Sequence, residues 1–299
     1  MADEHKLPAQ IAARALAPAE QAGSLVARGL EAIKNRQRSL ASVGVEADPE
    51  KSFREGVEAY KRRDFAEAVK RYRRAADQGH ALAPFNLALM YDKGQGVPQD
   101  DAAAVSWYRK GAAQGDARAQ CNLGAKYTNG RGVPQDYAAA ATWYRKAAEQ
   151  GDAKAEFFLG TIYKYGQGVP QDHAEAIKWF RRAAERGDPI AQCSLAVMYQ
   201  RRELPQDNAE AIKWYRRAAE QGYSNAQYTL GIVYVNGLGV PQDYVQAHLW
   251  FNRAVRSAAN PEERDRATKC RDGIVARMTP AQIAEAQRLV REWGESHAS

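Results

Sequence analysis

A 36-residue pattern repeats without a break through the middle of the sequence. Residues 117–152 read ARAQCNLGAKYTNGRGVPQDYAAAATWYRKAAEQGD, and residues 153–188 read AKAEFFLGTIYKYGQGVPQDHAEAIKWFRRAAERGD. The same landmarks recur at the same spacing: Tyr127 and Tyr163, Pro134 and Pro170, Trp143 and Trp179. A fixed period of this length is the signature of a stacked array, in which each unit contacts only its neighbours.

The pattern divides most of the chain into units. We place five full repeats at 81–116, 117–152, 153–188, 189–223 and 224–259. A shorter, related unit at 48–80 precedes them and lacks the glycine-proline loop. Residues 1–47 are interpreted as a helical and partly flexible segment, and residues 260–299 as two helices that cap the last repeat.

Each full repeat is predicted to be a pair of helices, A and B, because alanine is abundant and β-branched runs are rare. Helix A keeps three residue types four positions apart, which places them on one face. They are Ala83, Ala119, Ala155, Ala191 and Ala226; Leu87, Leu123, Leu159, Leu195 and Leu230; Tyr91, Tyr127, Tyr163, Tyr199 and Tyr234. A Gly-x-Gly pair then breaks the helix, since glycine adopts backbone angles that other residues resist.

Helix B follows an aspartate that is a natural N-cap in every full repeat. These aspartates are Asp100, Asp136, Asp172, Asp207 and Asp243. We expect helix B to turn one alanine column and one tryptophan column inward. The tryptophans are Trp107, Trp143, Trp179, Trp214 and Trp250. A glycine near the end of the helix is expected to terminate it.

The run A-x3-L-G-x2-Y, then G-x-G-V-P-Q-D, then A-x2-W-[YF], then A-A-x-x-G resembles the Sel-one-like repeat (SLR) family, a branch of the tetratricopeptide superfamily. The resemblance covers residues 81–259, and the unit at 48–80 looks like a plain tetratricopeptide repeat. It implies an all-α fold, an α/α superhelical solenoid of stacked helix hairpins with helical N- and C-terminal caps. It also implies an adaptor or scaffold without catalytic activity.

The N-terminal segment carries Leu25, Val26, Leu30 and Ile33 at helical spacing, which predicts an amphipathic helix over residues 19–39. This helix is interpreted as docking on the first repeat or pairing two chains into a self-assembling array; a membrane-surface helix is the alternative. The first residues do not resemble a signal peptide, and no apolar run reaches membrane-spanning length. We therefore expect a cytoplasmic protein.

The sequence contains none of the common catalytic motifs. It has no phosphate-binding loop, no H-E-x-x-H and no S-x-x-K, and its five histidines occupy unrelated repeat positions. We predict no enzyme activity, no cofactor and no metal site. Some secreted relatives with paired cysteines in each repeat have been linked to β-lactam binding or hydrolysis. That alternative is disfavoured because this chain has only Cys121, Cys193 and Cys270, which fit a reducing compartment.

The net charge is +7, and nearly all of the excess lies in the repeats. It is too spread out to favour nucleic acid, which selects a concentrated basic stripe. Pairs of basic residues recur near the end of helix B: Arg73-Arg74, Arg109-Lys110, Arg145-Lys146, Arg181-Arg182 and Arg216-Arg217. Two interpretations remain open. The pairs either grip an acidic surface, or they favour the helix dipole and the glutamates four residues on.

Helix A columns that vary between repeats are free to specialise. By resemblance to tetratricopeptide arrays, helix A lines the concave surface, and a protein or peptide partner would bind there. The candidate residues are Phe85, Lys93, Arg118, Asn129, Lys154, Phe157, Lys164, Tyr165, Arg201, Arg202, Tyr228 and Asn236. This mixture of cations and aromatic rings suits an acidic segment or a C-terminal carboxylate. The alternative for Phe85 and Phe157 is that they belong to the core between repeats.

One repeat departs from the pattern. Between Tyr199 and Pro205 the chain reads QRREL, one residue shorter than its counterparts and without glycine. The shorter loop is interpreted as a tolerated deletion. The alternative is that Arg201, Arg202 and Glu203 form a local contact site or a bend.

Overall fold

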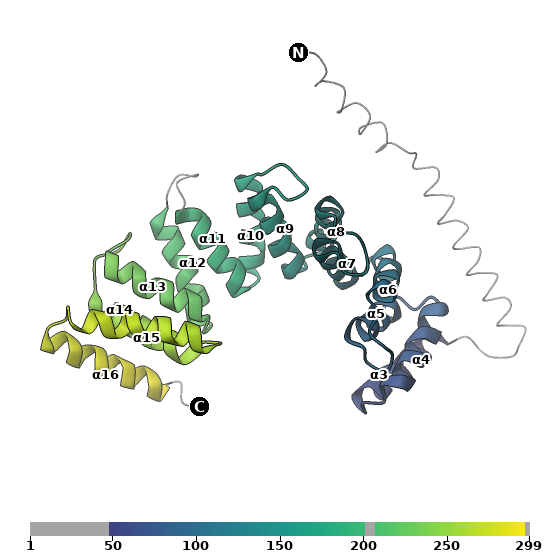
Figure 1. The fold of residues 1–299 in the computed structure, drawn as a ribbon, viewed down its shortest axis with the longest axis horizontal. Coiled ribbons are helices and arrows are strands. Elements are labelled where there is room, and N and C mark those ends of the chain that lie inside the picture. The colour runs from purple at the N-terminus through teal and green to yellow at the C-terminus, as the bar shows by residue number, and fades with distance from the viewer. Residues whose placement is uncertain (1–47, 201–206, 297–299) are drawn as a thin grey trace, which may run out of the picture. The chain divides into compact units, whose positions relative to one another are not determined.

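The computed structural model describes residues 48–200 and 207–296 (Figure 1). Within those residues the chain forms fourteen helices and no strand, which confirms the all-α prediction. The helix expected at 19–39 lies outside the described residues, as do Arg201 and Arg202.

The helices follow one another as hairpins. The first two hairpins are α3 (Pro49–Lys61) with α4 (Phe65–Asp77), and α5 (Ala83–Lys93) with α6 (Asp101–Ala113). The next two are α7 (Ala117–Asn129) with α8 (Tyr137–Glu149), and α9 (Ala153–Tyr165) with α10 (His173–Glu185). The last two are α11 (Pro189–Gln200) with α12 (Asn208–Glu220), and α13 (Ser224–Asn236) with α14 (Tyr244–Ser257). Two single helices follow, α15 (Pro261–Val275) and α16 (Pro280–Ser296).

The chain forms two compact units. The first contains residues up to Ala119 and Arg131–Val133, and the second contains Gln120–Gly130 and the chain from Pro134. The first unit therefore holds α3 to α6, and the second holds α8 to α16 with most of α7.

The predicted helix starts are present. Asp172 Oδ1 accepts hydrogen bonds from the backbone N–H groups of Ala174 and Glu175, and Asp136 accepts one from Ala139 at 2.9 Å. In α16, Thr279 and Gln282 bond each other reciprocally, side chain to backbone, at 2.9 and 3.3 Å. These caps satisfy N–H groups that have no partner inside the helix.

The loop glycines have two separate roles. Gly166 ends α9 in the left-handed conformation, with φ 67°. Gly168, with φ 69°, lies against the start of α8 in the preceding hairpin, where a Cβ atom would be 2.4 Å from the backbone nitrogen of Ala138. The first glycine therefore stops the helix, and the second lets the loop contact the neighbouring repeat.

The deepest ring of helix B is the one after each tryptophan. Phe180 is 1% exposed and Phe251 is fully buried. A glycine in helix A faces each of these two phenylalanine rings, so closely that a Cβ atom on Gly231 would lie 2.5 Å from Phe251. Trp143, by contrast, is only half-buried, so the prediction of an inward tryptophan column is correct in part. Trp179, Trp214 and Trp250 are buried, and Trp107 is half-buried.

In the five full repeats, each tryptophan ring is covered by the cation three residues after it, which is the second member of the basic pair in every full repeat but the last. Lys146 Nζ lies 4.4 Å from the centre of the Trp143 ring. The same stacking occurs for Lys110 on Trp107 at 3.7 Å, Arg182 on Trp179 at 4.7 Å, Arg217 on Trp214 at 4.6 Å and Arg253 on Trp250 at 4.6 Å. A cation over an indole face is attracted by the ring quadrupole.

The first cation of the pair reaches the next hairpin. Arg216 donates to the hydroxyl of Tyr234 at 3.1 Å. Equivalent bonds join Arg73 to Tyr91, Arg145 to Tyr163 and Arg181 to Tyr199. The sequence suggested that these arginines pair with the glutamates four positions on. Among the described residues, no such ion pair forms. The first cation of these pairs therefore contacts the next hairpin, and the second covers a tryptophan of its own helix in the full repeats.

Candidate functional site

Helix α9 exposes a stripe of side chains that the hairpin does not need for packing. Lys154, Phe158, Thr161 and Tyr165 are spaced by four, three and four residues and share one face; we call them the α9 stripe. Phe158 is 37% exposed and Tyr165 is 57% exposed. Lys164 lies beside the stripe, with Nζ 4.9 Å from the centre of the Tyr165 ring. In the described part of the chain, no carboxylate forms an ion pair with Lys154 or Lys164.

The neighbours of the stripe hold it in place. Phe158 stacks on Tyr144 of α8, with ring centres 5.2 Å apart. Phe157 meets Phe158 edge to face at 5.5 Å and packs against Phe180 at 5.7 Å. Phe157 is therefore half-buried against the core, and it supports the exposed ring that follows it.

The candidate residues of the first unit do not form an open aromatic site. Phe85 is 8% exposed, so the expectation that it lies on the surface is wrong. Its ring packs against Tyr108 and is covered by the Arg118 guanidinium at 4.3 Å. Arg118 in turn forms an ion pair with Asp116 at 2.7 Å. Lys93 is exposed at the end of α5.

Other candidates of the second unit differ in accessibility. Asn129 and Asn236 are exposed at the ends of α7 and α13, and Asn129 donates to the Ala125 carbonyl at 2.9 Å. Tyr228 is half-buried, because α15 places Arg266 over its ring at 4.5 Å and Cys270 3.5 Å from its hydroxyl. The cap therefore covers Tyr228, contrary to the expectation of an open surface.

Sequence reasoning missed Phe158 and Ile190, which is 46% exposed. The signal for Phe158 was present, because its repeat position otherwise holds only small polar residues: Asn86, Asn122, Ser194 and Thr229. A single aromatic ring in a polar column is a better sign of a surface contact than a ring in a column that is apolar throughout.

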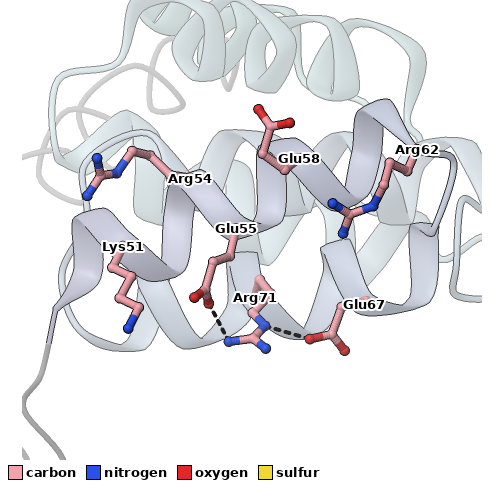
Figure 2. Close-up of a pocket in the computed structure, with 7 residues that line it drawn as sticks. All are labelled: Lys51, Arg54, Glu55, Glu58, Arg62, Glu67 and Arg71. Carbon is pink, nitrogen blue, oxygen red and sulfur yellow. Dashed lines mark hydrogen bonds and ion pairs between the residues drawn. The ribbon is translucent and has the colours of Figure 1, made fainter.

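A charged groove of about 540 Å³ runs along α3 and α4 in the first unit (Figure 2). It is lined by Lys51, Arg54, Glu55, Glu58, Arg62, Glu67 and Arg71. Arg71 forms an ion pair with Glu55 and another with Glu67 at 2.5 Å, as the dashed lines show. The hydrogen bond from Arg71 lowers the pKa of Glu67. Arg71, Glu55 and Glu67 therefore satisfy one another, whereas Lys51, Arg54 and Arg62 are exposed to solvent.

A buried carboxylate lies in the third full repeat. Glu156 is 0% exposed, and its two oxygens accept from Arg182 Nε at 3.0 Å and Arg186 Nε at 3.1 Å. Two guanidinium partners offset the cost of removing the charge from water. The same position holds Pro84 in the first full repeat and glutamine in the other three, so Glu156 is the one carboxylate in this column.

The three cysteines are free. Burial raises the pKa of Cys121 and of Cys193 to about 12, so both thiols are protonated at neutral pH. Within the described residues, no cluster of three or more His, Cys, Asp or Glu side chains has metal-binding geometry. None of the helices in that part of the chain is both long and apolar enough to cross a bilayer.

Successive antiparallel hairpins, stacked through small residues and helix B rings, define a tetratricopeptide-like helical repeat protein. The Sel1 repeat profile matches residues 55–80, 81–116, 117–152, 153–188, 189–223 and 224–257. The chain therefore belongs to the Sel1 repeat family. Sel1 repeat proteins generally mediate protein–protein interactions and are typically non-catalytic scaffolds.

Solved structures agree with this assignment. The chain is similar to c5321, a protective antigen of uropathogenic Escherichia coli with an SLR fold, at 33% identity and a TM-score of 0.71. The match covers 87% of this chain and 57% of that protein, so this chain spans little more than half of it. A Sel1 repeat protein from Oxalobacter formigenes is 34% identical with a TM-score of 0.66, over 75% of this chain and 87% of the other. No curated protein matches the sequence.

Proposed function

We propose that this protein is a non-catalytic scaffold that binds an acidic or carboxylate-bearing segment of a partner protein on its helix A surface. The α9 stripe is the principal contact, with Ile190 of α11 as a further exposed apolar residue. The observation that carries the proposal is that Phe158 and Tyr165 are exposed on the same helix as Lys154 and Lys164. Aromatic side chains that are solvent-exposed and flanked by cations are typical anchors at interfaces.

The charge of the stripe selects the chemistry of the partner. Lys154 and Lys164 lack carboxylate partners in the described residues, whereas cations on helix B have them. Lys178 lies 3.0 Å from Glu175 and Lys213 lies 2.8 Å from Glu210. An acidic segment would therefore pair with Lys154 and Lys164. An apolar residue beside the carboxylates of that segment would pack on Phe158.

The test is a display library of acidic, neutral and basic peptides, each with and without an aromatic residue. We expect the protein to select acidic peptides that contain aromatic residues, with affinity that falls as salt rises. Lys154→Glu with Lys164→Glu should abolish capture and leave the melting temperature unchanged.

Lys178→Glu with Lys213→Glu is the matched control, because it reverses two exposed charges on helix B. Capture should survive in this variant. Selection that is equal for acidic and basic peptides, or capture that survives the α9 reversal, would contradict the proposal.

A further inference from the structure

A buried polar side chain of helix A meets a donor at the end of helix B in three successive hairpins. Gln120 accepts from Gln150 Nε2 at 2.8 Å, Glu156 from Arg186 Nε at 3.1 Å, and Gln192 from Gln221 Nε2 at 2.9 Å. All three acceptors are at most 5% exposed. Where the acceptor is an amide the donor is an amide, and where it is a carboxylate the donor is a guanidinium.

The last hairpin keeps the acceptor and lacks the donor. Gln227 is 2% exposed, and its Nε2 donates to the Ala219 carbonyl at 2.9 Å, as Gln192 does to Ala184 at 3.1 Å. The residue at the donor position is Ser257, whose side chain is shorter than that of glutamine and has no amide group. Gln227 Oε1 has no hydrogen-bond partner among the described residues.

A second polar atom in the same place also lacks a partner. Arg253 occupies the repeat position of Arg182, whose Nε donates to Glu156. The Arg253 guanidinium lies between two indole rings, 4.6 Å from Trp250 and 4.7 Å from Trp293. Its Nε is buried and has no acceptor within the described part of the chain. A buried donor and a buried acceptor without partners cost free energy until a ligand satisfies them.

Both side chains line one cavity of about 490 Å³. The remaining walls are Ala219, Glu220, Gln221, Gly222, Ser257 and Trp293. The Trp293 ring comes from α16 and gives the cavity an apolar wall that the earlier hairpins do not have. A volume in this range holds a ligand of one or two amino-acid residues.

We propose that this cavity binds a primary carboxamide, the side chain of a glutamine in a partner segment. One carboxamide carries both missing groups, because its carbonyl oxygen accepts from Arg253 Nε and its N–H donates to Gln227 Oε1. The methylene groups of the glutamine pack on the Trp293 ring. The ligand takes the place that Gln150 and Gln221 fill in their own repeats. The site is separate from the α9 stripe and does not depend on the function proposed for it.

The binding test uses the full chain and three small probes, followed by the NMR signal of the Trp293 indole N–H and by calorimetry. N-acetyl-L-glutamine methylamide should bind at least tenfold more tightly than the corresponding glutamate and methionine compounds. Glutamate lacks the N–H donor, and methionine has neither polar group. Equal binding of the three compounds, or no binding of the glutamine compound, would overturn the proposal. Free L-glutamine as a fourth probe separates a free amino acid from a residue within a chain, and weaker binding than the capped form is the expected result.

The structural test restores the missing side chain within the protein. Ser257→Gln should raise the melting temperature and weaken binding of the glutamine probe at least tenfold, because the new carboxamide occupies the site. Ser257→Met fills a similar volume without a donor, and should block the probe without the same gain in melting temperature. A Ser257→Gln variant that binds the probe as tightly as the parent protein would contradict the assignment.

Discussion

The first and the last hairpins of the array differ in the polar side chains that line their cavities. At α3 and α4 the groove is lined by charged groups, among which Arg71 forms ion pairs with Glu55 and Glu67 (Figure 2). At α13 and α14 the cavity holds two buried polar atoms without partners, beside the indole rings of Trp250 and Trp293. The other cations that line the first groove, Lys51, Arg54 and Arg62, are exposed, so water can satisfy them. At the aromatic end, the carboxamide proposed above would supply both missing partners.

The largest expected effect tests whether both ends have a packed core. Phe251→Ala and Tyr72→Ala each remove a ring that is at most 4% exposed, and each should lower the free energy of unfolding by roughly 3–5 kcal/mol. Urea denaturation followed by circular dichroism measures the loss. Phe158→Ala is the control, since this ring is partly exposed and its loss should cost less. A Tyr72→Ala protein as stable as the parent would show that the first hairpin is not a packed end.

A smaller loss of stability is expected from single substitutions at the two end hairpins, and its dependence on salt should differ between them. Trp293→Ala removes one of the two rings that hold Arg253, and should lower the free energy of unfolding by about 1–2 kcal/mol at any salt concentration. Arg71→Gln should have a smaller effect that disappears in high salt, because exposed ion pairs are weak and screened. Denaturation midpoints at low and high sodium chloride provide the comparison. Equal salt sensitivity of the two variants would remove the distinction between the ends.

The smallest expected effect is a difference between the two end hairpins in how their local stability depends on pH. Burial, followed by the charge of Arg271, lowers the pKa of His248 in α14 below its usual 6.5, while Asp272 opposes this. The unfolded chain therefore takes up a proton more readily than the folded one, and stability falls as the pH drops below 6.5. We expect amide exchange in α14 to accelerate between pH 7.5 and 5.5, and His248→Gln to reduce that change.

The matched control is His80 in the first unit. Its Nε2 lies 3.1 Å from Glu50 Oε2, so this imidazole has a carboxylate beside it. His80→Gln should not protect α3 against acid in the same way. If lowering the pH accelerates amide exchange equally in α3 and α14, the predicted difference in acid sensitivity between the first and last hairpins is wrong.

Much of the fold was predictable because its determinants are local and repeat. The helix starts at Asp136 and Asp172, the left-handed glycine after α9 and the capping box of α16 each depend on residues within four positions. The same period that marks a repeat in the sequence also marks its position in the stack.

The site was less predictable because its determinants are distant. Phe85 and Phe158 are both aromatic residues of helix A, but Phe85 is covered by Arg118, 33 positions on, whereas Phe158 rests on Tyr144 and stays exposed. The partners of the basic pairs are tyrosines 18 residues away in the next hairpin. The buried charge of Glu156 is offset by Arg182 of α10 and by Arg186, the residue that follows this helix. Helical spacing shows which face a residue occupies, and it does not show what covers that face.

The buried polar pairs also bear on how such an array can change length. Gln120 with Gln150, Glu156 with Arg186, and Gln192 with Gln221 each lie inside a single repeat. A gene duplication or deletion of a whole repeat would therefore carry each of these acceptors together with its donor. A recombination point between the two helices of one repeat would leave Glu156 facing an amide, or an arginine facing Gln192. Recombination at the repeat boundaries therefore leaves no buried charge without its partner.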